Sequence, residues 1–148
     1  TQEKIELGFV GTPKEINQSI IEQIVKEKKV PVIAPLGLDK NKQVFNINAD
    51  TAAGAIAKKL NARRLIIMSD VEGVLDKDKK LIPEINTTKI DELIKSDTIS
   101  GGMIPKIKNC SDVASNGVKG VCIIDGRLDH SILFELLSNA GSGTLIRE

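Results

Sequence analysis

A glycine-rich turn that leads into a helix is one of four places in this sequence that concentrate residues able to do chemistry. Ser100, Gly101 and Gly102 precede a helical pattern with Lys106 in its first turn. Two glycines let backbone amides face an anion, the helix start adds its positive dipole end, and Lys106 could place a full charge beside a phosphoryl group. The spacing matches neither a P-loop nor a dinucleotide fingerprint. A Gly-Gly turn followed by a solvated lysine is therefore the alternative.

A second polar cluster stands where an extended segment ends and a helix begins. Asn46 offers both a hydrogen-bond donor and an acceptor, and Asp50 offers a carboxylate. Open α/β sheets bind their ligands at the carboxyl ends of their strands, which is where these side chains are expected. The alternative is that Asn48 or Asp50 only caps the helix, an effect of ~1 kcal/mol.

A third candidate segment, residues 69–75, leaves a buried strand through a glycine. Asp70 could bond a ribose or orient a loop, and Gly73 allows a ligand to approach the backbone closely. A plain β-turn with Gly73 at positive φ is an equally good interpretation.

The sequence has a single histidine, His130, with Glu135 five residues later and Gly141 beyond. One histidine does not allow a convincing Ser-His-Asp or Cys-His arrangement. By itself, a histidine in the first turn of a helix is typical of a solvated or capping residue.

Composition indicates one globular domain and excludes several function classes. The chain has 148 residues, 41% hydrophobic, and 21 Lys+Arg nearly balance 20 Asp+Glu. There is thus no basic field for nucleic acid, and no apolar run approaches the ~18 residues of a membrane span. Cys110 and Cys122 lack metal-ligand spacing and are predicted to be reduced, buried thiols. We expect a cytoplasmic protein without nucleic-acid or membrane partners. Because the chain begins Thr-Gln-Glu-Lys without an initiator Met, we expect it to have been processed or cut.

The apolar periodicity predicts alternating strands and helices. Strands are expected at 4–10, 30–36, 43–47, 65–68, 118–124 and 143–146, and helices at 16–25, 48–60, 87–95, 103–115 and 129–137. Thr12-Pro13 and Asp129 are predicted to start the first and last helices, and residues 74–82 to form a hairpin. This order predicts an α/β fold with a mostly parallel sheet covered by helices on both faces. The 30–36 run is expected to be a buried parallel strand.

Taken together, these segments resemble the acetylglutamate kinase branch of the amino acid kinase family. Six segments match in the family's order: 7–11, 46–50, 69–75, 101–106, 124–127 and 143–146. The resemblance covers essentially the whole chain and implies the family's fold. It also implies ATP-dependent phosphorylation of the side-chain carboxylate of N-acetylglutamate.

The resemblance also implies roles for single residues. Asn46 matches the residue that holds the acyl amino acid, Asp50 the one that organises catalytic lysines, and Lys106 the one that stabilises the transferring phosphoryl group. The matching nucleotide pocket comprises Asp70, Val71, Glu72, Gly73, Val74, Leu75, Thr98, Ile99 and Ser100. The substrate's own carboxylate is the nucleophile. Mg²⁺ is expected to be carried mainly by ATP, without protein metal ligands.

The family's N-terminal half carries a glycine-rich loop and a second catalytic lysine, but this sequence has no Lys-x-Gly-Gly pattern. We therefore expect residues 1–148 to be a single nucleotide-binding lobe that lacks the N-terminal substrate lobe and catalyses little alone. The complete enzyme is expected to be a homo-oligomer. The alternatives are a non-catalytic nucleotide-binding or regulatory module and a related kinase acting on acetylaminoadipate.

In this family, a pattern like that of His130, Glu135 and Gly141 marks enzymes inhibited by arginine. A carboxylate such as Glu135 can pair with a guanidinium, and a glycine lets a ligand approach the backbone. The resemblance thus implies an arginine effector site at these three residues.

Overall fold

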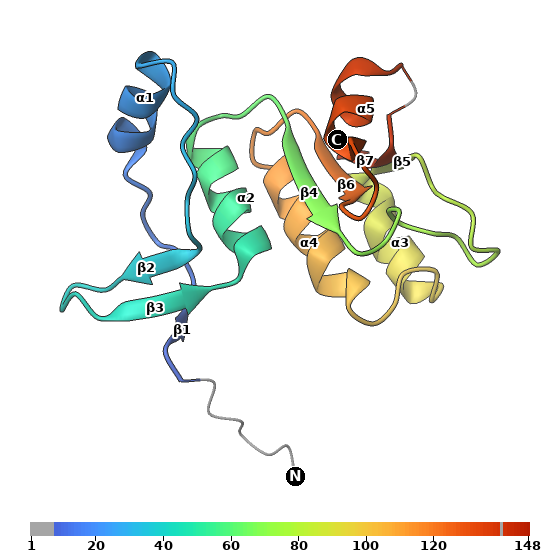
Figure 1. Cartoon of the computed structure of the whole chain (residues 1–148). Helices are drawn as coiled ribbons and strands as arrows, with labels where there is room; N and C mark the ends of the chain where they lie inside the picture. Colours follow the sequence, from blue (N-terminus) through green and yellow to red (C-terminus); the bar gives the residue numbers. More distant parts are fainter. Residues whose placement is uncertain (1–7, 140) are drawn as a thin grey trace, which may run out of the picture.

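The computed structural model describes residues 8–139 and 141–148 (Figure 1). Its helices are α1 (Gln18–Lys26), α2 (Ala49–Lys59), α3 (Ile90–Lys95), α4 (Met103–Ala114) and α5 (Ser131–Leu137), with a 3₁₀ turn, η1, at Thr87–Lys89. Its strands are β1 (Val10–Gly11), β2 (Leu36–Leu38), β3 (Val44–Ile47), β4 (Leu65–Ser69), β5 (Glu84–Asn86), β6 (Val121–Asp125) and β7 (Gly143–Arg147). The α/β class expected from the sequence is confirmed.

The strands form two mixed sheets rather than one mostly parallel sheet. Their orders are β1-β3-β2 and β4-β6-β7-β5. The pairs β1–β3, β4–β6 and β5–β7 are parallel. The pairs β2–β3 and β6–β7 are antiparallel. For β2 and β3 the reason is local, because a short turn between consecutive strands permits only antiparallel pairing.

The main core lies between the four-stranded sheet and the helices α2, α3 and α4. On α4, Ile107, Cys110 and Val113 are fully buried. Every residue of β6 is buried. Since side chains alternate along a strand, Val121 and Ile123 join this core while Cys122 and Ile124 face the side contacted by α5. Helices thus cover both faces of β6.

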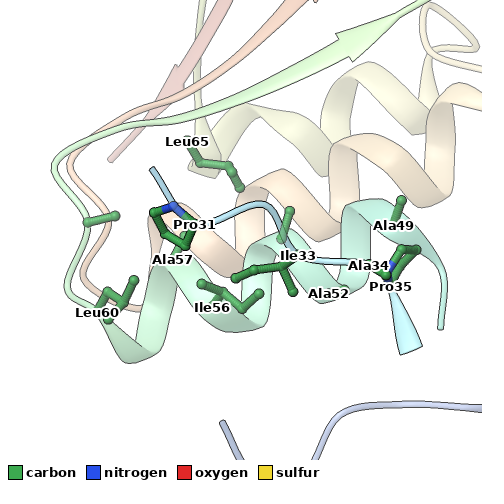
Figure 2. A pocket seen from close by; sticks show the side chains of 12 residues that line it. Pro31, Ile33, Ala34, Pro35, Ala49, Ala52, Ile56, Ala57, Leu60 and Leu65 are labelled. Atoms are coloured by element: carbon green, nitrogen blue, oxygen red, sulfur yellow. The ribbon is translucent and has the colours of Figure 1, made fainter. Parts of the chain in front are cut away.

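The prediction of a buried parallel strand at 30–36 is wrong. Only Leu36 belongs to a strand, β2, and Val30 and Val32 are 85% and 96% exposed. Pro31 and Pro35 have no N–H to donate, so the segment lacks donors that a central strand needs. It runs instead along α2, and together they line an apolar pocket of ≈ 470 Å³ (Figure 2).

Two predicted helix starts are also wrong. Asn17, not Thr12, is the N-cap of α1, and residues 12–16 are not helical. His130, not Asp129, precedes α5, and it adopts a left-handed conformation with φ 61°. Of the strand expected at 4–10, residues 4–7 lie outside the described residues, and only Val10 of the remainder is in β1.

Other local predictions are confirmed, and they determine where the site lies. Residues 75 and 81 pair antiparallel, as the predicted hairpin requires. Asn48 caps α2, its Oδ1 accepting the Thr51 N–H at 3.1 Å. In Figure 1 the N-terminal ends of α2 and α4 and the carboxyl ends of β4 and β6 point toward the same side of the molecule. Asp50, Asp70 and Lys106 are therefore presented at one edge.

Candidate active site

Asp50 and Lys106 form an ion pair between the first turns of α2 and α4. The Lys106 Nζ donates to Asp50 Oδ2 at 2.6 Å, and the two side chains are 21% and 27% exposed. A carboxylate is favoured at the N-terminus of a helix, whereas a lysine there opposes the helix dipole. Asp50 offsets that unfavourable position of Lys106. The structure thus joins two of the predicted catalytic side chains, which are 56 residues apart in sequence.

The pair opens into a polar cavity of ≈ 290 Å³. Its lining residues are Asn48, Asp50, Thr51, Gly102, Pro105, Lys106 and Asn109. Gly101 has φ +55°, a conformation that favours glycine, and nothing lies within 4 Å of where a Cβ would stand on Gly101 or Gly102. The cavity therefore combines a lysine, two helix N-termini and an open glycine turn. These are the features that bind and stabilise phosphoryl groups.

The asparagine and aspartate cluster divides into different roles. Asn48 is a helix cap, which confirms the capping alternative for that residue. Asp50 lies in the first helical turn instead, and its carboxylate pairs with Lys106. Asn46 is exposed on β3, the central strand of its sheet, and is not among the residues that line the cavity. Its substrate role stays a prediction.

The strand exit, which comprises residues 70–75 after β4, contains both exposed and buried residues. Asp70 and Glu72 are exposed, whereas Val74 and Ile99 are each only 2% exposed. Gly73 has φ +148°, and a Cβ there would lie 2.6 Å from Thr144 Oγ1. Val74 and Ile99 therefore offer a ligand almost no surface, and the N–H and C=O of Val74 are already bonded, to Thr144 Oγ1 and to the Ile82 N–H. The nucleotide role of 70–75 and 98–100 stays a prediction.

A fork-shaped ion pair borders this strand exit. Asp125, 3% exposed at the end of β6, accepts two hydrogen bonds from the Arg127 guanidinium at 2.9 and 2.8 Å and one from its N–H at 2.9 Å. Gly126 N–H donates to Ser69 O at 2.7 Å, which ties the turn to the end of β4. Hydrogen bonds from Arg127 hold the pKa of Asp125 well below its usual value, at about 2.

We expect the stability of the fold at low pH to depend on the ion pair between Asp125 and Arg127. The depressed pKa means that Asp125 stabilises the fold fully above about pH 4, and that this contribution is lost as pH falls through about 2. Urea unfolding between pH 2.5 and 6 should show Asp125→Asn less stable than wild type above pH 4, with the difference shrinking toward low pH. Exposed Asp129→Asn is the matched control. A difference that stays constant with pH would contradict the assignment.

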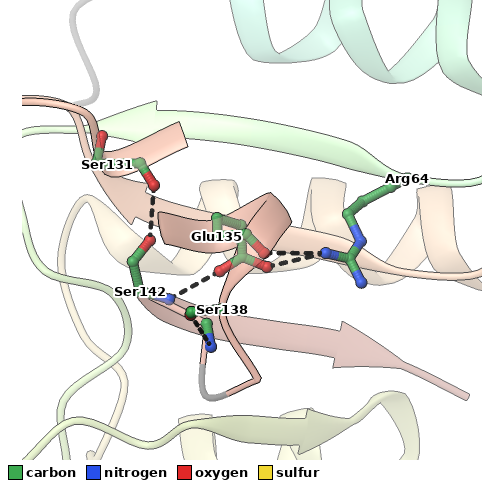
Figure 3. A network of polar contacts seen from close by, with 6 residues as sticks. Arg64, Ser131, Glu135, Ser138 and Ser142 are labelled. Carbon is green, nitrogen blue, oxygen red and sulfur yellow. Dashed lines mark hydrogen bonds and ion pairs between the residues drawn. The ribbon is translucent and has the colours of Figure 1, made fainter. Parts of the chain in front are cut away.

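Glu135 is the centre of a second polar network, shown in Figure 3. It is 8% exposed, so its carboxylate is buried rather than solvated. Its Oε1 accepts Arg64 Nη1 at 3.3 Å, and its Oε2 accepts the Ser142 N–H at 2.9 Å. A Cβ on Gly141 would lie 2.9 Å from Oε2. His130 is exposed and makes no side-chain cap bond.

The two cysteines are free and buried, as predicted. Burial, followed by a hydrogen bond with Glu135, raises the pKa of Cys122 to about 12. Burial, followed by the nearby Asp50 charge, raises the pKa of Cys110 to about 12. Both thiols therefore remain protonated at neutral pH.

Sequence reasoning gave no role to three polar side chains that the structure places beside the predicted ones, although Arg127 belongs to the matched segment 124–127. Arg64 pairs with Glu135, Asn109 donates to the main-chain oxygen of Asp50, and Arg127 pairs with Asp125. Two of them had a usable signal. Asn109 lies three residues after Lys106 and hence on the same face of a helix, and Arg127 ends the matched segment 124–127.

Among the described residues, 8–139 and 141–148, no helix has the length and apolar character to traverse a bilayer. No group of three or more His, Cys, Asp or Glu in this part of the chain is arranged to hold a metal ion.

Known proteins resemble this chain in sequence. Residues 1–125 match the model of the amino acid kinase family. The acetylglutamate kinase of Pelagibacter ubique (strain HTCC1062) is 71% identical over 147 residues, covering 99% of this chain and 51% of that protein. The acetylglutamate kinase of Rhodopseudomonas palustris (strain BisB18) is 49% identical over 147 residues, covering 99% of this chain and 49% of that protein. The chain spans about half the length of the curated relatives it matches.

Solved structures resemble it in fold. N-acetylglutamate synthase from Neisseria gonorrhoeae, complexed with coenzyme A and L-arginine, aligns with TM-score 0.87 and 22% identity over 95% of this chain and 32% of that chain. Carbamate kinase from Giardia lamblia bound to AMP-PNP aligns with TM-score 0.68 and 22% identity over 93% of this chain and 46% of that chain. At these identities the likeness concerns the fold alone.

Proposed function

Because this chain belongs to the amino acid kinase family, we propose that it is the ATP-binding part of an acetylglutamate kinase. The reaction transfers a phosphoryl group from ATP to the side-chain carboxylate of N-acetylglutamate, a step of arginine biosynthesis. The Asp50–Lys106 pair in the cavity between two helix N-termini is the observation that carries this proposal. The sequence identity of 71% to an acetylglutamate kinase supports the choice of substrate.

The geometry suits phosphoryl transfer, which depends on positioning and charge stabilisation more than on covalent chemistry. Lys106 carries an ammonium that can donate to phosphoryl oxygens as negative charge spreads over them. Asp50 fixes that ammonium at 2.6 Å, so little reorganisation is needed during the reaction. The open turn at Gly101 and Gly102 and the first turn of α4 add backbone dipoles. The attacking oxygen belongs to the substrate's carboxylate.

We place the nucleotide across the edge between the β4 exit and the N-terminus of α4. Asp70 and Glu72 are exposed there, and Ser100 is exposed in the turn before α4. The adenine and ribose would contact these exposed side chains, and the buried Val74 and Ile99 would support the segments that carry them. Asn46 would hold the acyl amino acid, together with an N-terminal substrate lobe that the remainder of the complete enzyme supplies.

The proposal includes Mg²⁺, ATP and a small-molecule substrate. Mg²⁺ would be carried mainly by the phosphates of ATP, where it neutralises their charge. The described residues fit that arrangement, since Asp50 is engaged by Lys106 and no cluster of three ligands occurs among them. The complete enzyme is proposed to be a cytoplasmic homo-oligomer.

A chimera tests the function directly. In it, this chain replaces the matching 147 residues of the Pelagibacter ubique acetylglutamate kinase. We expect the chimera to release ADP only when N-acetylglutamate is present, and the chain alone to show little turnover. The control is the Pelagibacter enzyme without its matching residues.

Two results would redirect the proposal. Nucleotide binding by the chimera without turnover would favour a non-catalytic nucleotide-binding module. A preference for N-acetyl-aminoadipate over N-acetylglutamate in competition would favour the related kinase. Failure to bind ATP at all would refute the nucleotide site.

We also propose that Glu135 is the guanidinium ligand of an arginine effector site, with His130 and Gly141 at its border. The specific support is that Glu135 already binds one guanidinium, that of Arg64, and that a side chain at Gly141 would collide with the carboxylate. Arg64 would then have to share or release Glu135 when arginine binds. Binding here could bias the relation between two lobes, which is how a remote site changes turnover.

Calorimetry of arginine with the chimera checks this site. Glu135→Gln keeps the shape of the side chain and removes its charge. It should raise the Kd for arginine by roughly 30-fold or more, about 2 kcal/mol of binding free energy. Arg64→Gln should strengthen binding, because it frees the carboxylate. Glu92→Gln, a change at an exposed residue of α3, is the control. Equal binding by the parent and Glu135→Gln, or no binding by the parent, would remove the effector site.

A further inference from the structure

We propose that Asn109 is a positioning residue, one that fixes α2 against α4 along their axes and so holds Asp50 and Lys106 together. This inference rests on the phosphoryl-transfer function proposed above. It adds a residue of α4 whose side chain acts through the main chain of Asp50 rather than on the reacting groups.

The key contact joins a side chain of one helix to the backbone of the other. Asn109 Nδ2 donates to the main-chain oxygen of Asp50 at 3.0 Å. A carbonyl oxygen has two lone pairs, so this bond adds to the helical one rather than replacing it. Asn109 lies one turn after Lys106 and lines the same cavity. Asp50 is therefore held twice by α4, through its carboxylate and through its backbone.

The remaining contacts between α2 and α4 come from residues of α2 that follow Asp50 at intervals of four. A Cβ on Gly54 would lie 2.7 Å from Val113 Cγ2, so the helices touch closely one turn beyond Asp50. One turn further, Lys58 pairs with Asp112. Asp50, Gly54 and Lys58 thus face α4 at intervals of four residues.

These contacts differ in how strictly they fix the axial position. The contact between Gly54 and Val113 contains no hydrogen bond that could set an axial position, and the Lys58–Asp112 pair is weakly constrained because its side chains are 33% and 54% exposed. A hydrogen bond to a backbone oxygen is directional and fixes one position. A displacement of about 1 Å at a catalytic group can cost roughly 10²-fold in rate. Hence Asn109 matters for turnover more than for holding the helices together.

The first test uses the 148-residue chain and NMR. Asn109→Ala and Asn109→Asp both lose the donor, and the second keeps the side-chain volume. Both should move the ¹³C resonances of the Asp50 carbonyl and carboxylate. Asn116→Ala is the matched control, because Asn116 lies just beyond the end of α4 and its Nδ2 donates to Asp112 of that helix, to the carbonyl at 2.7 Å and to Oδ1 at 3.0 Å, and not to the backbone of α2. It should leave the Asp50 resonances in place.

The second test is kinetic and uses the chimera. Asn109→Ala and Asn109→Asp should lower kcat roughly tenfold with KM for ATP and for N-acetylglutamate within about twofold. In a Lys106→Ala background, Asn109→Ala should lower kcat no further, because the residue acts through that pair. Asn116→Ala should leave kcat unchanged.

Each failure has a distinct meaning. An unchanged kcat in Asn109→Asp, an equal loss in both backgrounds, or unmoved Asp50 resonances would overturn the positioning role. If Asn109→Ala does not fold, the volume-conserving aspartate variant decides. If the unmodified chimera lacks turnover, the proposed function fails, and the Asp50 resonances alone decide whether Asn109 fixes Asp50.

Discussion

Replacing Lys106 by alanine in the chimera should lower kcat by roughly 10²-fold or more and leave ATP affinity nearly unchanged. The ammonium is fixed 2.6 Å from Asp50 at the mouth of a cavity formed by two helix N-termini. A charge held in this way interacts most with phosphoryl oxygens when their charge rises in the transition state. Steady-state kinetics together with ATP calorimetry separates the two effects.

Two further variants sharpen this test. Lys106→Arg should recover only part of the loss, because a planar guanidinium does not occupy the place of a compact ammonium. Lys108→Ala removes an exposed lysine from the same helix and should leave kcat within about twofold. A Lys106→Ala chimera with unchanged kcat would reduce Lys106 to a structural partner of Asp50.

The sequence predicted the fold best where local chemistry decides the outcome. Asn48 followed by an alanine-rich stretch signalled the start of α2, and the cap is present in the structure. The prediction of a strand at 30–36 was wrong because an apolar run indicates hydrophobicity but does not show whether another strand is available to pair with it. His130 adopts a left-handed backbone conformation that no local pattern predicted, and α5 therefore begins after His130 and not at Asp129.

For the site, local patterns could predict residue types but not pairings. Local context singled out Asp50 and Lys106 separately, and only the family resemblance implied that Asp50 organises catalytic lysines; their bond spans 56 positions. Glu135 was expected to meet a guanidinium, but no local pattern could name Arg64, which is 71 positions away. Such contacts depend on how helices and strands pack, so the structure was needed to show which polar groups are already satisfied.

The packing of β7 beside the strand exit should not accommodate even a single methyl group added at Gly143. A Cβ at this position of β7 would lie 2.0 Å from the main-chain oxygen of Ile123 and 3.0 Å from Ile124 Cα. Both obstacles are backbone of the buried strand β6, so the two strands would have to separate locally. Thr144, the next residue, accepts the Val74 N–H at 2.8 Å and donates to Ile82 O at 2.7 Å. A shift of β7 therefore strains buried hydrogen bonds that hold the 70–75 segment.

We expect Gly143→Ala to destabilise the 148-residue chain by roughly 3 kcal/mol or more, from overpacking and from weakened buried hydrogen bonds. Urea unfolding followed by circular dichroism measures the change. Gly102→Ala is the matched control, because its φ is −64° and no atom lies within 4 Å of the added Cβ. That control should change stability by less than about 1 kcal/mol. Equal stabilities for the two variants would show that β6 and β7 separate at little cost, and would remove Thr144 as the anchor of the strand exit.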